Sequence, residues 1–195
     1  MKKHQEDFKN MKAALLQEGY KEKDVTFTAK KATLLGLLYS LPFIAILGLI
    51  YRFLLVGRAH LTEITEASFY VTFFTIMIIS TVIHELLHGF GWAFSSGHGW
   101  KAVRFNINAL MPSCACRSAL EKRQYLIGVL LPLTVLGTIS ALFLVIYPGT
   151  ISFFTMIINF ILAGADLIIA FNVLKEENSL IIDHPVEAGY IAFYK

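Results

Sequence analysis

The sequence predicts an all-α integral membrane protein with four transmembrane helices and a short β-hairpin-like insertion between the second and third helices. Of its 195 residues, 56% are hydrophobic and only 16% are charged, whereas soluble domains carry about 25% charged residues. The apolar residues gather into runs of about 20 residues or more, long enough to cross roughly 30 Å of hydrocarbon as helices. The predicted spans cover residues 33–51, 69–94, 125–147 and 151–174.

The basic residues indicate how these spans are oriented. All but two of the 17 Lys and Arg residues lie before the first span, between the second and third, or after the fourth; the exceptions are Arg52 and Arg58. Because cytoplasmic loops carry the excess of Lys and Arg, we expect a multi-pass protein of the cell membrane with both termini in the cytoplasm. We expect a cytoplasmic juxtamembrane segment (1–31), a transmembrane domain (32–174) and a cytoplasmic tail (175–195). A net charge of +3 is too small to indicate nucleic-acid binding, which leaves the lipid bilayer as the expected environment.

A short helix is predicted before the first span, over residues 3–18. Phe8, Met11 and Leu15 share one face of this helix, and Gly19 follows as a stop signal. We expect it to lie along the membrane surface.

The insertion between the second and third spans has the pattern of a hairpin. Residues 103–108 alternate apolar and polar side chains, as a half-buried strand does. A turn around residues 111–113 is expected to return the chain through residues 114–117. Ser118 and Glu121 then have the spacing of a capping box that opens the third span.

Few titratable side chains fall inside the spans. Among the acids these are Glu85 and Asp166, and among the histidines His84 and His88. A charged residue at the bilayer centre costs about 2.5–3.5 kcal/mol even on the mildest scale. Such residues are therefore functional candidates, each expected to have a partner.

Three of the four occur in the run His84-Glu85-Leu86-Leu87-His88. On a helix, residues four apart lie on one face, so both imidazoles can reach the same Zn²⁺ ion. The adjacent glutamate can then serve as general base on zinc-bound water. The alternative is a pair of helix-face histidines that only form hydrogen bonds with neighbouring groups.

A catalytic zinc site needs a third protein ligand and an open position. Asp166 is favoured by depth, because His84 and Asp166 each lie 15 residues into a span of the same direction. The longer pattern H-E-x-x-H-x-x-G-x-x-H matches as far as Gly91 and fails at Phe94. The other candidates are His98, Glu121, Asp183, His184, Cys114 and Cys116.

Asn159 is a further candidate for the site. It precedes Asp166 by seven residues, which places it two helical turns away on the same face. Its amide could bind substrate or the transition-state oxyanion, or it could form an interhelical hydrogen bond.

The sequence resembles the family of integral membrane proteins described as putative zincin peptidases, and more distantly the site-2 protease class of intramembrane zinc metalloproteases. The similar segments are residues 84–89, 123–125 with 131–132, 159–167, and 182–190. In site-2 proteases, two histidines from one span and an aspartate from a later span bind zinc. The resemblance therefore implies His84, His88 and Asp166 as ligands and Glu85 as the base.

Together these features predict a membrane-embedded zinc metalloendopeptidase of the HExxH type. Its substrate is expected to be a protein or peptide associated with the membrane, and an extended segment of that substrate could pair with the edge of the 103–117 hairpin. Two alternatives remain at this stage: a catalytically silent zinc-binding regulator or adaptor, and a transporter subunit.

Overall fold

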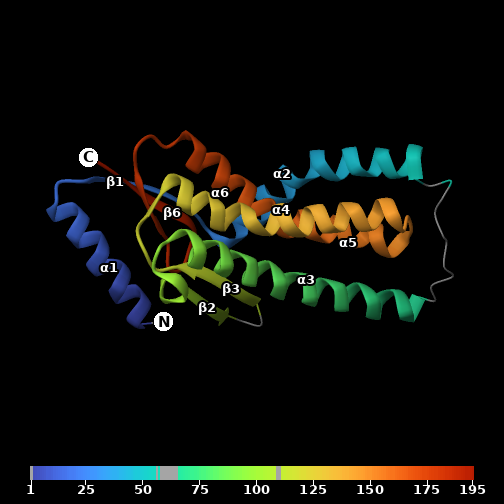
Figure 1. Ribbon diagram of the computed structural model, residues 1–195, viewed down its shortest axis with the longest axis horizontal. Coiled ribbons are helices and arrows are strands. Elements are labelled where there is room, and N and C mark those ends of the chain that lie inside the picture. The colour runs from blue at the N-terminus through green and yellow to red at the C-terminus, as the bar shows by residue number, and fades with distance from the viewer. Residues whose placement is uncertain (1, 56, 58–65, 109–110) are drawn as a thin grey trace.

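The long apolar runs of the sequence form long helices that lie along one axis of the molecule (Figure 1). A computed structural model describes residues 2–55, 57, 66–108 and 111–195. Three of its helices are long and apolar enough to cross a membrane. Their outer faces expose large apolar side chains such as Leu34 (67% exposed) and Val71 (68%), as lipid-facing surfaces do. These helices are α2 (Ala29–Ile50), α3 (Glu66–Ser95) and α4 (Lys122–Ile146), and a π-helical turn (Tyr51–Leu55) continues α2.

The predicted fourth span is not one continuous helix. It is divided into α5 (Thr150–Leu162) and α6 (Gly164–Lys175), which meet at an angle of 42°. The number of possible spans among the described residues is therefore three, or four if the bent pair is counted as one. Gly164 starts α6 against α2, where a Cβ atom would lie 2.3 Å from the carbonyl oxygen of Gly36. The two helices therefore approach closely at Gly164, and glycine at the break is a usual cause of a kink.

The two ends of the chain join in one antiparallel sheet that the sequence did not predict. Its strand order is β1-β6-β5-β4. In the predicted cytoplasmic tail, β5 and β6 bring the buried residues Ile181, Tyr190 and Ala192 into a core shared with α4 and α6. The strands are β1 (Lys21–Phe27), β4 (Leu120–Glu121), β5 (Leu180–Asp183) and β6 (Ala188–Tyr194).

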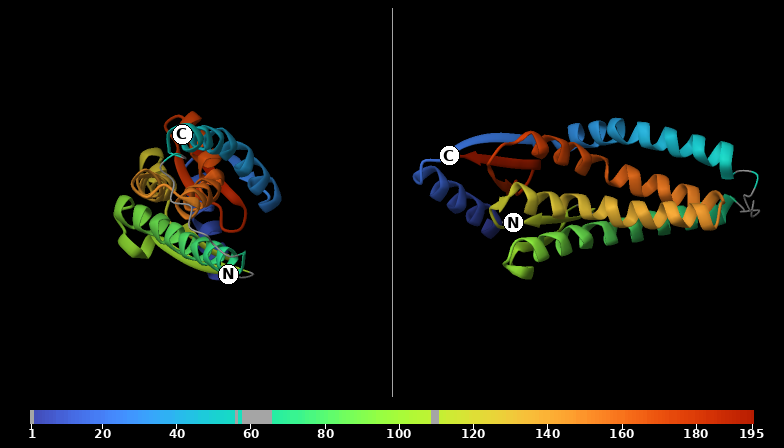
Figure 2. Two further views of the ribbon diagram at one scale, coloured as in Figure 1. Left: turned by 90° about the vertical axis from the view of Figure 1, so that its right-hand side faces the viewer. Right: turned by 45° about the horizontal axis from the view of Figure 1, so that its top comes forward.

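The expected N-terminal helix is present as α1 (Lys2–Gln17), and Gly19 follows it with a positive φ of 88°. The helix does not rest with its apolar face on a membrane surface, however. Leu15 is buried against Ile182, Ile191 and Phe193 of the sheet. Figure 2 shows α1 and the sheet together at one end of the molecule, with the long helices extending away from them. The predicted membrane-surface position of this helix is wrong because the sheet supplies an apolar surface for it, which the local sequence does not reveal.

The hairpin between α3 and α4 is confirmed. After a short 3-10 helix, η3 (Gly99–Ala102), strand β2 (Val103–Asn108) pairs antiparallel with β3 (Met111–Cys116). The turn predicted at residues 111–113 is wrong, because these residues pair with residues 106–108.

The N-cap of α4 lies three residues later than the predicted cap at Ser118. The backbone N–H of Glu121 donates to Gln124 Oε1 at 2.9 Å, so the cap involves Glu121 and Gln124 rather than Ser118 and Glu121. Pairing of Leu120 and Glu121 with β5 holds this segment extended and delays the helix.

Candidate metal centre

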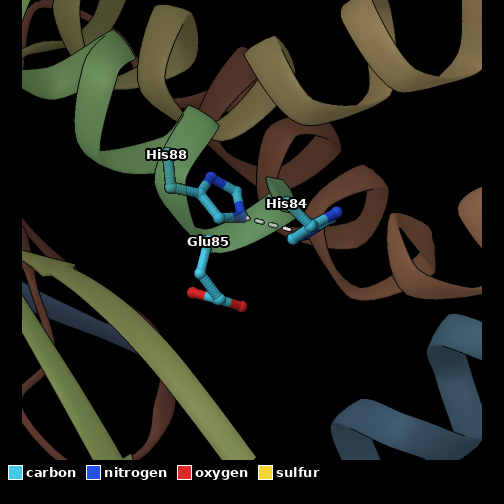
Figure 3. Close-up of side chains that lie close together, drawn as sticks. All are labelled: His84, Glu85 and His88. Carbon is cyan, nitrogen blue, oxygen red and sulfur yellow. Dashed lines mark hydrogen bonds between the residues drawn. The ribbon is translucent and has the colours of Figure 1, made fainter. Parts of the chain in front are cut away.

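The two histidines of the HExxH run lie side by side on α3. Helical spacing places His84 Nε2 3.1 Å from His88 Nε2. Figure 3 shows the two rings next to each other. Both residues are buried, with 5% and 6% of their surface exposed. Each of the two imidazoles offers a nitrogen within 4.8 Å of a carboxylate oxygen of Glu85. A single turn of one helix therefore supplies two nitrogen donors and one carboxylate.

The break between α5 and α6 brings a second carboxylate to the same point. Asp166 lies in the first turn of α6, with Oδ2 3.0 Å from His84 Nε2 and Oδ1 3.4 Å from His88 Nε2. It is also buried, at 8% exposure. His84 and Asp166, which were predicted to lie at the same depth, are thus in contact although they are far apart in the sequence.

These three side chains fit a zinc ion. With zinc–ligand bonds of about 2.0–2.1 Å, neighbouring ligand atoms of a tetrahedral site lie about 3.3 Å apart, close to the separations of 3.0, 3.1 and 3.4 Å found here. Asp166 Oδ2 is buried and has no hydrogen-bond partner among the described residues. Two imidazole nitrogens and a carboxylate are also a common donor set of catalytic zinc, leaving the fourth position open.

His88 is held in place by contacts on parts of its ring other than Nε2. Its Nδ1 lies 2.8 Å from the carbonyl oxygen of Gly128 in α4, and its ring stacks on Trp92 with centroids 5.4 Å apart. A carbonyl oxygen can only accept a hydrogen bond, so Nδ1 carries the proton. In the neutral ring, Nε2 then presents its lone pair toward His84 and Asp166, as metal-binding histidines usually do.

Glu85 contacts the hairpin rather than the bundle interior. Its Oε2 accepts a hydrogen bond of 2.5 Å from the backbone N–H of Cys114 in β3. The side chain is half-buried. This contact places a carboxylate next to the two histidines and at the edge of a strand.

The family model described as "Putative zincin peptidase" matches residues 77–181, which is more than half of the chain. The chain belongs to this family. The matched segment contains His84, Glu85, His88, Asn159 and Asp166. Neither the search of curated proteins nor that of solved structures gave a match. The distant resemblance to site-2 proteases therefore remains an expectation.

The other candidate ligands that the sequence offered have contacts away from the site of His84, His88 and Asp166. His98 is exposed at the start of η3, and Glu121 caps α4. His184 Nδ1 accepts a hydrogen bond of 2.8 Å from the backbone of Glu187. Where the longer motif would place a histidine, Phe94 is 87% exposed, so the side chain at this position points away from the site.

The two cysteines lie on β3, and burial raises the pKa of both thiols, that of Cys116 to about 12. Zinc binds the thiolate form of cysteine, which such values disfavour at neutral pH. In the part of the chain that the structure describes, neither thiol belongs to the cluster of His84, Glu85 and His88.

Asp183 has a role that sequence analysis missed. It lies in β5 and joins the hairpin to the rest of the protein, since it accepts hydrogen bonds from the N–H of Cys116 (3.0 Å) and from the hydroxyl of Tyr125 (2.7 Å). Burial raises the pKa of its carboxyl group to about 7. No local sequence signal could have found this role, because all three residues come from different elements.

Asn159 is buried in α5. Its Nδ2 donates to the carbonyl oxygen of Thr155 at 3.0 Å, and its Oδ1 has no partner among the described residues. A buried acceptor without a partner is suited to a donor that arrives with a ligand.

Proposed function

We propose that this protein is a membrane-embedded zinc metallopeptidase that hydrolyses peptide bonds of membrane or membrane-proximal proteins. The observation that supports this most directly is the convergence of His84, His88 and Asp166 at ligand-like distances inside the apolar helices, beside the carboxylate of Glu85. We assign the first three as zinc ligands and Glu85 as general base. Membership of a zincin peptidase family agrees with this assignment.

Each part of the chain then has a defined task. Zinc, when bound, supplies a Lewis acid that lowers the pKa of a water molecule toward about 7 and stabilises negative charge on the substrate carbonyl oxygen. Glu85 takes the proton of the attacking water and passes it to the leaving amine. Asn159 is proposed to contact the substrate through its unpartnered Oδ1.

The hairpin is proposed to hold the substrate in an extended form. The N–H of Cys114 points away from β2 and binds Glu85, so this edge of β3 faces the proposed base. A substrate strand that paired here would take over the N–H of Cys114 and leave the Glu85 carboxylate free for water. Helical substrates must unwind before cleavage, and pairing with a strand edge would favour the unwound state.

The proposed orientation places the site on the cytoplasmic side. Most Lys and Arg residues belong to the end of the molecule that carries α1 and both sheets, and the contact between Glu85 and β3 links the site to that end. By the positive-inside rule this end faces the cytoplasm. Water would then have a short path to the proposed centre.

The test is hydrolysis by the purified full-length chain in phosphatidylcholine vesicles with Zn²⁺. The probes are fluorescein-labelled casein and a labelled single-span peptide reconstituted in the same vesicles. Glu85→Gln is expected to retain zinc and to reduce cleavage at least 100-fold, because it removes the base but no ligand.

The matched control is His98→Ala, which removes an exposed histidine outside the cluster and should leave both zinc and cleavage unchanged. Cleavage that survives Glu85→Gln would contradict the proposed role of this residue. Tight zinc binding without cleavage of either probe would favour the silent regulator, and solute flux through vesicles with metal-free protein would favour a transporter subunit.

A further inference from the structure

Pro132 lies inside the membrane-spanning helix α4 and is fully buried. Proline has no backbone N–H, so it cannot donate the helical hydrogen bond to the carbonyl four residues earlier. For Pro132, that carbonyl belongs to Gly128. The helix therefore contains one backbone acceptor that its own hydrogen-bond ladder does not use.

That acceptor is the one that contacts His88. The carbonyl oxygen of Gly128 lies 2.8 Å from His88 Nδ1, and both residues are buried. A carbonyl normally paired within its helix has become the partner of a side chain from a neighbouring helix. The carbonyl that Pro132 leaves without a helical partner is therefore the same one that His88 contacts.

Glycines allow the two helices to approach closely enough for this contact. A Cβ atom on Gly91 of α3 would lie 2.6 Å from the Cα atom of Gly128, so a larger residue there would force the backbones apart. Gly91 belongs to the continuous helix α3, which extends to Ser95. Gly91 therefore serves helix packing and does not end the helix.

We propose that Pro132 is a positioning residue for the metal centre. By withholding an N–H from the Gly128 carbonyl, it leaves that oxygen to hold the Nδ1 proton of His88, which fixes the ring with the Nε2 lone pair facing His84 and Asp166. The inference rests on the metal centre proposed above but does not require that the protein cleave peptides. It gives a chemical role to a residue that touches neither metal nor substrate.

The main alternative is that Pro132 only bends or packs α4. The two roles depend on different features of proline. The proposed role depends on the missing N–H, whereas the packing role depends on the ring. Pro132→Ala restores the N–H, whereas replacement of Pro132 by lactic acid, the hydroxy-acid analogue of alanine, removes the ring without adding an N–H. A matched control is Pro42→Ala, which changes an exposed proline inside α2.

The first measurement is Zn²⁺ affinity of the purified full-length chain in detergent, by competition with a chromophoric chelator. Because a carbonyl has two lone pairs, the restored N–H would share the Gly128 oxygen and weaken the His88 bond without abolishing it. We expect Pro132→Ala to lower affinity about tenfold, at the lower end of the usual effect of losing the partner of a metal ligand. The lactic acid variant and Pro42→Ala should stay within about twofold of the wild type, well below that effect.

The second measurement is the ¹⁵N NMR spectrum of the histidine rings in the metal-free protein, at a pH high enough that the rings are neutral. His88 of the wild type and of the lactic acid variant should carry its proton on Nδ1, and Pro132→Ala should show a mixture of the two tautomers. This readout needs no metal and no activity, and the wild-type spectrum remains informative even if Pro132→Ala fails to fold.

Three outcomes would overturn the proposal: unchanged affinity in Pro132→Ala, an equal loss in the lactic acid variant, or a wild-type His88 protonated on Nε2. Failure of the proposed peptidase function looks different. In that case zinc binds tightly and the wild-type His88 carries its proton on Nδ1, but no probe is cleaved.

Discussion

Replacing Asp166 by asparagine tests the assignment of the third ligand most directly. Asp166→Asn keeps the volume and one carbonyl oxygen, so the buried position in α6 stays filled, but it removes the charge that Zn²⁺ needs from an oxygen ligand. The two carboxylate oxygens lie 3.0 and 3.4 Å from the two Nε2 atoms. They therefore face the nitrogens proposed to bind zinc, whereas a residue that orients a ligand binds the other ring nitrogen, as the Gly128 carbonyl does at His88 Nδ1.

The size of the effect follows from that distinction. Losing a residue that only orients a ligand lowers metal affinity 10–100-fold, so losing a ligand should exceed about 100-fold, or about 2.8 kcal/mol at 1.4 kcal/mol for each factor of ten. The assay is zinc per chain by mass spectrometry after dialysis against a chelator, followed by a competition titration. The wild type should retain about one zinc, and Asp166→Asn should retain almost none.

Asn159→Ala is the matched control, because it removes another buried polar side chain from the same broken span. It is expected to keep zinc and to lower only the rate of cleavage. Zinc content unchanged in Asp166→Asn would refute the geometric reasoning and exclude Asp166 as a ligand. Equal losses in both variants would indicate a general disturbance of the bundle.

Further expectations concern stability and reactivity. Because burial raises the pKa of Asp183 to about 7, the folded protein retains a proton that the unfolded chain loses near pH 4, so stability should fall as pH rises from about 4 to about 7 and then level off. In Asp183→Asn this part of the pH dependence should disappear from thermal unfolding in detergent. The thiol of Cys116 should resist iodoacetamide at pH 8 until the protein unfolds, since its pKa is raised to about 12 and the side chain is buried. Gly91→Ala should lower the unfolding temperature and zinc affinity together, because its Cβ would lie 2.6 Å from Gly128, and overpacking of this kind costs about 1–3 kcal/mol.

Each of these expectations has a clear opposite result. A fall in stability between pH 4 and 7 that is as large in Asp183→Asn would assign that pH dependence to other groups. Rapid alkylation of Cys116 in the folded protein would contradict its burial. For the glycine, Gly48→Ala is the control, since no described atom lies within 4 Å of the added Cβ; equal effects at both positions would argue against the close helix contact.

Much of the helical framework could be predicted because it depends on local pattern. Runs of apolar residues specify helices of membrane-spanning length, and the spacing of His84 and His88 places two imidazoles on one face of any helix that contains them. The hairpin could also be predicted, since alternation over residues 103–108 is a local signal. Asp166 was favoured by counting residues along two spans, an argument that needs only the rise of a helix and the direction of the chain.

Other features depend on contacts between segments that no local pattern connects. The pairing of β1 with β6 joins residues more than 160 positions apart. Through this sheet, the helix predicted to lie on the membrane surface and the C-terminal tail contribute to one core. The break at Gly164 lies in close contact with Gly36, which belongs to another helix.

The groups that hold the site in place are the least visible in the sequence. Glu85 binds the backbone N–H of Cys114, and His88 binds the carbonyl of Gly128. Pro132 indicates that the carbonyl of Gly128 lacks its helical partner, but no side chain in the sequence indicates that His88 will reach this carbonyl, or that the N–H of Cys114 will meet Glu85. Residue types and helical spacing determine which donors this chain can offer to a metal, whereas only the packing of one backbone against another decides which partners orient them.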